Sequence, residues 1–354
     1  MQSKLFGAIL ACAFAGLTSA AESAETVYIP LGSANAVLLV DAAGDRVIGR
    51  IDGIEAVHGL AATPDGRLLI AGSYNERQVG SAAPPKPADI SEDAHAQHHA
   101  ASKAAGEATG SVISTVTFIS TDSRMVVRRV DVPGAVHHAA VSPDGGFAIL
   151  THPNQDRISV LDLGSFAVVA TVATGKLPNY AVFSPDGRTV YVSNAGDERV
   201  SAVDTGQWNV RLNYDVGASP EHLVLSADGR TLYVNNVDEG TVSVIDLGSG
   251  NVTTPYAVGA SPHGIGLSAD GGTLFVSVMG EDKLVAVNLS AGQVREAALA
   301  PSPYHLASIN SFGKIYVSSA EEPKLWIVDQ LSLKVLGEIV IGGKGHQMVQ
   351  SGGG

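Results

Sequence analysis

The strongest constraint in this sequence is an internal repeat with a period of 41 or 42 residues. The four clearest copies contain a Ser-Pro-Asp-Gly or Ser-Ala-Asp-Gly turn, a Tyr-Val type segment, a polar loop and an alternating Val-x-Val-Asp segment. The clearest copies begin at Ser142, Ser184, Ser226 and Ser268, and a looser copy begins at Asn310. A repeat near 40 residues that holds several short strands is typical of a β-propeller blade.

One position marks the start of the first strand in every repeat, and we call it the slot. The slot residues are His58, His137, Asn179, Glu221, His263, Tyr304 and His346. The position that follows the slot, here called the second column, holds Gly59, His138, Tyr180, His222, Gly264, His305 and Gln347. Seven slots predict seven blades.

The two ends of the chain together supply one blade. Residues 27–29 have the pattern of a second strand, residues 36–41 and 46–51 follow as further strands, and residues 346–350 match the missing first strand. Pairing of the two ends would close the ring and leave no open sheet edge. We therefore predict an all-β, seven-bladed β-propeller with N-/C-terminal strand closure, formed by residues 21–354 as a single domain.

Residues 1–20 predict a cleavable signal peptide. Lys4 precedes an apolar run over residues 5–17, and Thr18-Ser19-Ala20 provides small residues for cleavage. The run is too short to span a bilayer comfortably, so we expect a periplasmic protein without a membrane span. Lipid attachment at Cys12 is the alternative. Cys12 is the only cysteine, so the processed chain would hold a metal through nitrogen and oxygen atoms alone.

One repeat is interrupted by an insertion. The slots at His58 and His137 are 79 residues apart, and the excess lies between the second and third strands of that blade. We expect residues 74–112 to form a flexible, histidine-rich loop, because this stretch has few large apolar residues. Its metal-capable residues are Asp93, His95, His98 and His99. A solvated loop without a metal role is the alternative.

Seven of the eleven histidines fall in the slot and the second column. Because the first strands of a propeller surround its central channel, these side chains should converge, with the insertion on the same face. The candidate metal ligands are His58, His137, His138, His222, His263, His305, His346 and Glu221, together with Asp93, His95, His98 and His99 of the insertion. A single site should lie beside the insertion, with His263 outside it.

Zinc is the expected metal, because imidazole and carboxylate groups bind it with three or four ligands. Copper is the alternative, since imidazole also binds copper and Met348 lies two residues from His346. A purely structural role, in which the histidines cap backbone groups at a wet channel mouth, remains the competing interpretation.

The Ser-Pro-Asp-Gly, Tyr-Val-x-Asn and Val-x-Val-Asp pattern resembles that of the YVTN-type β-propellers over nearly the whole processed chain. Within that family the chain looks most like the periplasmic zinc metallochaperones that serve metal-importing ABC systems. The resemblance implies a zinc site at the propeller face, a flexible histidine loop, and a solute-binding protein of an ABC importer as partner.

No catalytic motif is evident in the chain. It has no Gly-x-Ser-x-Gly elbow, no Gly-rich phosphate loop before a helix and no Cys-x-x-Cys-His haem attachment. We therefore predict a monomeric metal-binding protein that is not an enzyme. The alternatives are a periplasmic enzyme or electron-transfer propeller that uses a cofactor or metal, and an interaction scaffold. The net charge of −13 argues against a nucleic-acid partner.

Overall fold

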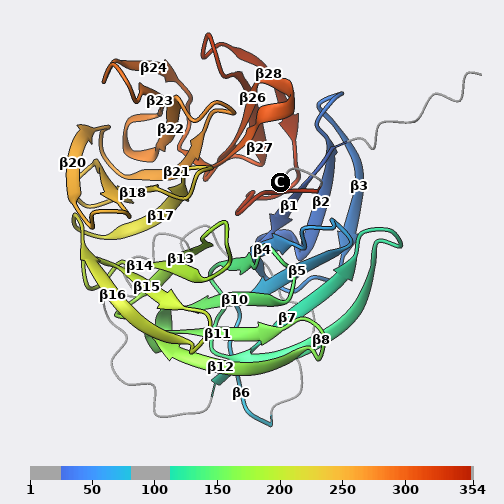
Figure 1. The fold of residues 1–354 in the computed structure, drawn as a ribbon. Coiled ribbons are helices and arrows are strands. Elements are labelled where there is room, and N and C mark those ends of the chain that lie inside the picture. The colour runs from blue at the N-terminus through green and yellow to red at the C-terminus, as the bar shows by residue number, and fades with distance from the viewer. Residues whose placement is uncertain (1–24, 81–111, 352–354) are drawn as a thin grey trace, which may run out of the picture.

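The computed structural model describes residues 25–80 and 112–351. Seven antiparallel sheets radiate from a central channel, and the chain runs through them in order around the ring (Figure 1). The prediction of an all-β, seven-bladed β-propeller is confirmed. Blades are numbered from the blade that contains the N-terminal strand.

Each blade has four main strands, ordered from the channel outward. The channel-lining strands are β29 (Val349–Ser351), β4 (Val57–Ala62), β9 (Ala139–Val141), β13 (Pro178–Phe183), β17 (Pro220–Leu225), β21 (Pro262–Leu267) and β25 (Pro303–Ile309). The second strands are β1 (Thr26–Leu31), β5 (Leu68–Ser73), β10 (Phe147–His152), β14 (Thr189–Asn194), β18 (Thr231–Asn236), β22 (Thr273–Val278) and β26 (Lys314–Ser319).

The third strands are β2 (Ala36–Asp41), β7 (Val112–Ser120), β11 (Arg157–Asp162), β15 (Arg199–Asp204), β19 (Thr241–Asp246), β23 (Lys283–Asn288) and β27 (Lys324–Asp329). The outer strands are β3 (Arg46–Asp52), β8 (Met125–Pro133), β12 (Ala167–Ala173), β16 (Asn209–Asp215), β20 (Val252–Ala257), β24 (Val294–Ala298) and β28 (Val335–Val340). Short 3-10 turns occur at η1 (Gly32–Ala34), η2 (Pro153–Gln155), η3 (Met279–Glu281) and η4 (Asn310–Phe312).

The repeated Ser-x-Asp-Gly motif forms the turn between the first and second strands. In blade 3 the Ser142 hydroxyl donates to Asp144 Oδ1 at 2.6 Å, and the Gly146 N–H donates to the same oxygen at 2.9 Å. Gly145 has a φ of 71°, a left-handed conformation that glycine adopts without steric cost. Ser184, Ser226 and Ser268 make the same hydroxyl contact in the next three blades.

The core lies between neighbouring blades. Second and third strands are buried over most of their length, whereas outer strands are largely exposed. One apolar cluster, for example, joins Tyr191 and Val200 of blade 4 to Leu223 and Leu232 of blade 5. Because each sheet buries its face on the next one, the inner strands and their slot residues are held at fixed positions around the channel.

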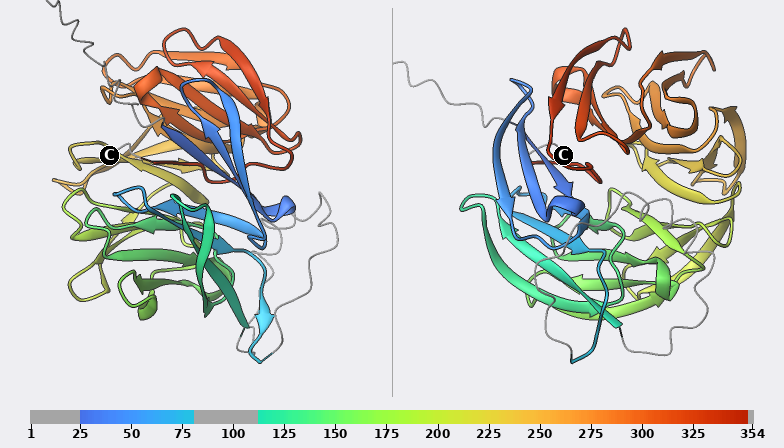
Figure 2. Two further views of the ribbon diagram at one scale, coloured as in Figure 1. Left: turned by 90° about the vertical axis from the view of Figure 1, so that its right-hand side faces the viewer. Right: turned by 180° about the vertical axis from the view of Figure 1, so that it is seen from behind.

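The ring closes as the sequence predicts. Strand β29 pairs antiparallel with β1, with Thr26 opposite Ser351, so the C-terminal strand completes the first blade (Figure 2). The seam to blade 7 is reinforced by Asp45, which accepts a hydrogen bond from the Tyr316 hydroxyl at 2.5 Å and lies 2.6 Å from Lys314 Nζ.

Part of the predicted insertion belongs to the sheet of blade 2. Strand β6 (Arg77–Gln78) pairs with the start of β7, with Arg77 opposite Ile113, so strand pairing extends into the interval 74–112. Asp93, His95, His98 and His99, like the predicted signal peptide, lie outside the described residues. Across residues 25–80 and 112–351, no helix is long and apolar enough to cross a bilayer.

Candidate metal-binding site

A β-bulge at the slot brings two consecutive side chains to the channel. In blade 5 the pairing with β18 passes from Pro220–Asn236 to Leu223–Val234, so Glu221 and His222 lie opposite a single residue. Blades 4, 6 and 7 have the same irregularity after Pro178, Pro262 and Pro303. Neighbours in a regular strand point to opposite faces, and a bulge of this kind redirects one of them.

The bulges assemble a compact group of imidazoles from three consecutive blades. Ligand nitrogens of His222, His263 and His305 all lie within 4.8 Å of one another. Their ring centroids are 4.2 Å apart for His222 and His263, 4.8 Å for His222 and His305, and 4.9 Å for His263 and His305. All three side chains are buried. We call this group the histidine triplet.

A second layer of contacts positions the triplet. Glu221 Oε2 lies 3.2 Å from His263 Nδ1, a contact of the kind that fixes the orientation of an imidazole ring. Tyr304 stacks on His263 with a centroid distance of 4.1 Å. The Asn235 amide of the preceding blade donates to the His263 carbonyl at 2.6 Å, and the Ser277 hydroxyl donates to the Tyr304 carbonyl.

The surroundings of two triplet members, His222 and His305, favour neutral imidazole. Burial, followed by the neighbouring His263, lowers the pKa of His222 well below its usual value, and burial with His222 nearby does the same to the pKa of His305. His305 Nε2 is buried and has no hydrogen-bond partner within the described part of the chain. Neutral imidazole is the form that binds metal, so the triplet fits a divalent transition-metal ion.

His58, His137 and His346 form a second group on the other side of the channel. The His58 ring lies 4.5 Å from that of His137 and 4.3 Å from that of His346. His58 Nδ1 donates to the His137 carbonyl at 2.8 Å, and His137 Nδ1 donates to the Asn179 carbonyl at 3.1 Å. The ring of His305, 5.8 Å from that of His346, connects this group to the triplet.

The grouping differs from the one expected from sequence. We expected a single site beside the insertion with His263 outside it, but among the described residues the tightest group contains His263 and lies in blades 5 to 7. It mixes one slot residue with two residues of the second column. The sequence carried a signal for this arrangement in the prolines that precede the slots of blades 4 to 7, because proline within a sheet is confined to strand starts, edges and bulges.

Two other histidines hydrogen-bond to the protein, His138 through one ring nitrogen and His152 through both. His138 Nδ1 accepts a hydrogen bond from the Ala181 N–H at 3.2 Å, and its ring stacks on Tyr180 at 3.4 Å. Burial lowers the pKa of His138 well below its usual value. His152 Nδ1 donates to the Ala135 carbonyl at 3.0 Å and its Nε2 accepts from the Ser159 hydroxyl at 2.8 Å. His138 therefore stands apart from the triplet, and His152 has a structural role.

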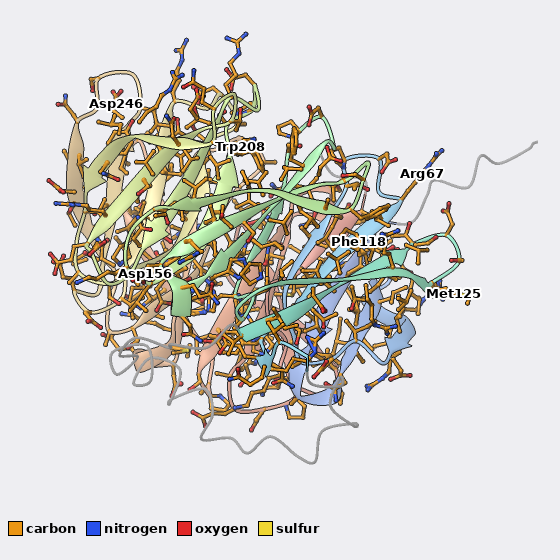
Figure 3. All side chains as sticks on the ribbon, turned by 90° about the horizontal axis from the view of Figure 1, so that it is seen from below. Arg67, Phe118, Met125, Asp156, Trp208 and Asp246 are labelled. Carbon is orange, nitrogen blue, oxygen red and sulfur yellow. The ribbon has the colours of Figure 1, made fainter. Side chains whose placement is uncertain are left out.

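A cavity of about 750 Å³ reaches one member of the triplet, His263. His263, Glu221, Tyr304 and Asn179 line its inner part. Its rim is formed by loops that follow second strands and by the turns that precede the slots, on the face opposite the Ser-x-Asp-Gly turns. Figure 3 shows Asp156 toward this face and Asp246 at the other.

One protein-family model matches part of the chain. Residues 151–310, a little under half of the chain, match the family model described as lactonase, 7-bladed beta-propeller. No curated protein sequence matches the chain.

Solved structures with the same fold have little sequence in common with this chain. The periplasmic gluconolactonase PpgL of Pseudomonas aeruginosa is 19% identical over 92% of this chain and 99% of that one, with a TM-score of 0.70. A putative 6-phosphogluconolactonase from Bacteroides uniformis is 13% identical over 93% and 100%, also with a TM-score of 0.70. Hydrazine synthase of Kuenenia stuttgartiensis is 19% identical over 83% and 86%, with a TM-score of 0.60.

The prediction that the chain is not an enzyme is contradicted by the family match, because lactonases are hydrolases. The absence of a local motif misled the prediction. A propeller collects its functional groups from several blades, so catalytic residues need not be near one another in sequence. Residues 151–310 carry the sequence pattern of the lactonase seven-bladed β-propeller family, and the chain as a whole has that seven-bladed architecture.

Proposed function

We propose that this protein binds a divalent metal ion, with zinc as the first choice and copper as the alternative, on His222, His263 and His305. The observation that carries the proposal is the approach of three buried imidazoles to within 4.8 Å. Three histidines with an open fourth position form a well-established zinc coordination set. The Glu221 carboxylate against His263 supports the proposal, since such contacts orient metal-bound imidazoles.

In this proposal the ion is cargo. The protein acts as a periplasmic zinc metallochaperone that delivers the ion to the solute-binding protein of an ABC importer. His263 lines a cavity of about 750 Å³, large enough to admit a ligand group from a partner, which supports exchange of the ion. The group of His58, His137 and His346 offers further imidazoles nearby. Export by the predicted signal peptide and a monomeric state belong to the same proposal.

A second candidate function is metal-assisted hydrolysis of a lactone, which the family match favours. A bound zinc ion would supply Lewis acidity and a more acidic water molecule. Tyr304 and Asn179 in the cavity wall would orient the ring of the substrate, and Glu221 would hold His263 in place.

Metal binding is tested by elemental analysis of the untagged protein and by zinc titration. We expect one equivalent of zinc with submicromolar affinity, and a loss of at least about 100-fold in affinity for His222→Gln or His305→Gln, because each removes a ligand. The matched control is His152→Asn, since Asn194 and Asn236 occupy the equivalent positions in the next two blades. Binding weaker than micromolar, or equal affinity in all variants, contradicts the proposal.

The two uses of the ion are separated by two assays on the zinc-loaded protein. If delivery is direct, the rate of zinc transfer to a periplasmic solute-binding protein should rise with the concentration of that acceptor. This rate should also exceed the rate at which zinc dissociates spontaneously and is captured by a chelator. Hydrolysis predicts zinc-dependent acid release from an aldonolactone, which the His305→Gln variant loses. A transfer rate equal to spontaneous dissociation contradicts delivery, and unchanged acid release in His305→Gln contradicts metal-assisted hydrolysis.

A further inference from the structure

The cavity that His263 lines has an acidic rim. Asp156, Glu198 and Asp238 line it from the loops that follow three consecutive second strands, and Lys176 is the one cationic side chain among the described lining residues. All four are exposed. Asp156 is held in place, because its Oδ1 accepts the Leu177 N–H at 3.0 Å. With Glu221 deeper inside, the lining carries four carboxylates against one ammonium group.

A second and independent feature lies in the wall of the same cavity. The Asn179 side chain is only 8% exposed, and its Oδ1 is buried without a hydrogen-bond partner in the described part of the chain. A buried carbonyl oxygen that lacks a donor costs folding free energy, so a donor supplied by a ligand would be stabilising. Asn179 and Glu221 both line the cavity, so its inner wall offers hydrogen-bond acceptors to whatever enters.

We propose that this cavity is a vestibule that captures a fully hydrated divalent cation before the ion loses water to the histidine triplet. The proposal rests on the proposed metal site. The water molecules around a divalent cation are strongly polarised hydrogen-bond donors, which suits a wall of carboxylate and amide oxygens. Six waters occupy on the order of 180 Å³ at about 30 Å³ each, so the hydrated ion fits within about 750 Å³.

The vestibule separates capture from dehydration. The rim carboxylates raise the local concentration of cations by long-range attraction, which accelerates association and is weakened by salt. Asn179 and Glu221 then hold the ion through its water molecules, and exchange of those waters for imidazole nitrogens follows as a slower step. Binding should therefore proceed through a saturable intermediate.

Stopped-flow mixing of the metal-free full-length processed protein with Co²⁺ tests this order of events, because cobalt bound to histidines absorbs visible light. We expect the observed rate to level off as the Co²⁺ concentration rises. The rim variant Asp156→Asn/Glu198→Gln/Asp238→Asn should lose about tenfold in association rate at low ionic strength, with most of the difference gone at high salt. The association rate of Asn179→Leu should fall about fivefold, because this variant loses one hydrogen bond to the hydrated ion. The final spectrum should be unchanged in both.

The matched control removes three carboxylates from the opposite face, as Asp186→Asn/Asp228→Asn/Asp270→Asn. Each of these aspartates accepts hydrogen bonds within a Ser-x-Asp-Gly turn, and asparagine can do the same. We expect this variant to bind Co²⁺ at nearly the wild-type rate, because its lost charges are far from the cavity.

The possible failures are distinguishable. A rim variant with the rate and salt dependence of the wild type overturns the vestibule and leaves the metal site intact. Equal slowing of the control variant also overturns it, because net charge alone would then explain the effect. A wild-type protein that gives no cobalt spectrum overturns the proposed metal site together with this inference.

Discussion

At the residue scale, the channel is notable for histidines that are kept neutral by burial. Burial, partly offset by hydrogen bonds to the backbone, lowers the pKa of His152 to about 4, and the pKa values of His138, His222 and His305 are also lowered. At neutral pH these uncharged rings can either bind a metal ion or form hydrogen bonds within the protein. The same burial makes protonation costly, so acid should weaken the fold as well as the metal site.

The metal-free protein should lose stability as the pH falls below about 6.5. A histidine whose folded-state pKa is lowered contributes stability that is present above the unfolded value of about 6.5 and is lost as the pH falls toward the folded value. For His152 the loss totals about 3 kcal/mol between pH 6.5 and 4. His152→Asn keeps a partner for Ser159, as Asn194 does for Ser201, and removes this titration.

Urea unfolding at pH 7 and pH 5 provides the measurement. Between pH 7 and pH 5, the free energy of unfolding of the wild type should fall by about 2 kcal/mol more than that of His152→Asn. Equal losses in the two proteins would show that His152 is protonated without cost in the folded state.

Glu221→Gln tests the carboxylate behind His263. Loss of the charge that supports the imidazole should reduce zinc affinity about 10- to 100-fold without abolishing binding. Competition with a zinc chelator at pH 7.5 measures the change. The matched variant is Glu198→Gln, at the exposed rim of the cavity, which should keep the equilibrium affinity within a few fold of wild type.

At the scale of the element, the repeated bulge is supported from the neighbouring blade. The fifth residue of a second strand donates a hydrogen bond to the carbonyl of the next slot residue, as Thr151 does to Asn179 at 2.9 Å and Ser193 does to Glu221 at 2.5 Å. Asn235 and Ser277 make the equivalent contacts to His263 and Tyr304. One blade thus fixes the channel residue of the following blade.

Asn235→Leu should therefore displace His263. The variant leaves the buried His263 carbonyl without its donor, which should cost about 1–3 kcal/mol of unfolding free energy and lower zinc affinity. Asn235→Ser carries the hydroxyl that blades 4 and 6 use at this position and should recover most of both losses. Denaturant unfolding and zinc competition measure the two effects. Full zinc affinity in Asn235→Leu would exclude a positioning role for this contact.

At the scale of the whole molecule, ring closure joins segments from both ends of the chain. The Gln347 side chain extends from the C-terminal segment to blades 2 and 3, where it accepts from the Leu60 N–H at 3.2 Å and donates to the Ala139 carbonyl at 3.0 Å. On the opposite side of blade 1, Tyr316 and Lys314 of blade 7 hold Asp45. The closed ring keeps blades 5 to 7, and with them the triplet, in register.

Tyr316→Phe should weaken the seam between blades 7 and 1. The buried hydroxyl donates to a carboxylate, a type of hydrogen bond worth about 1.5–3 kcal/mol, so the urea midpoint should fall by a corresponding amount. Tyr233→Phe is the matched control, because Tyr233 holds the equivalent strand position in blade 5 without such a carboxylate. Equal midpoints for the two variants would show that the contact adds nothing to closure.

The period of the repeat, the turn chemistry and the strand alternation together determine the architecture from the sequence alone. Each of these features is local and recurs in most of the blades, so the seven slots and the alternating strands imply seven sheets and closure by residues 346–350. The sequence also identified His222, His263, His305 and Glu221 as candidates, because repeats align their channel positions.

Only the tertiary structure decided which candidates meet. The bulges after Pro220, Pro262 and Pro303 turn second-column and slot residues toward the same channel, and the angle between blades sets which rings approach. His263, expected to lie outside the site, is part of the triplet, while His138 and His152 are engaged by backbone and hydroxyl groups. The residue pattern of a strand predicts which side chains point to the same face. Distances across the channel depend instead on how all seven sheets pack together.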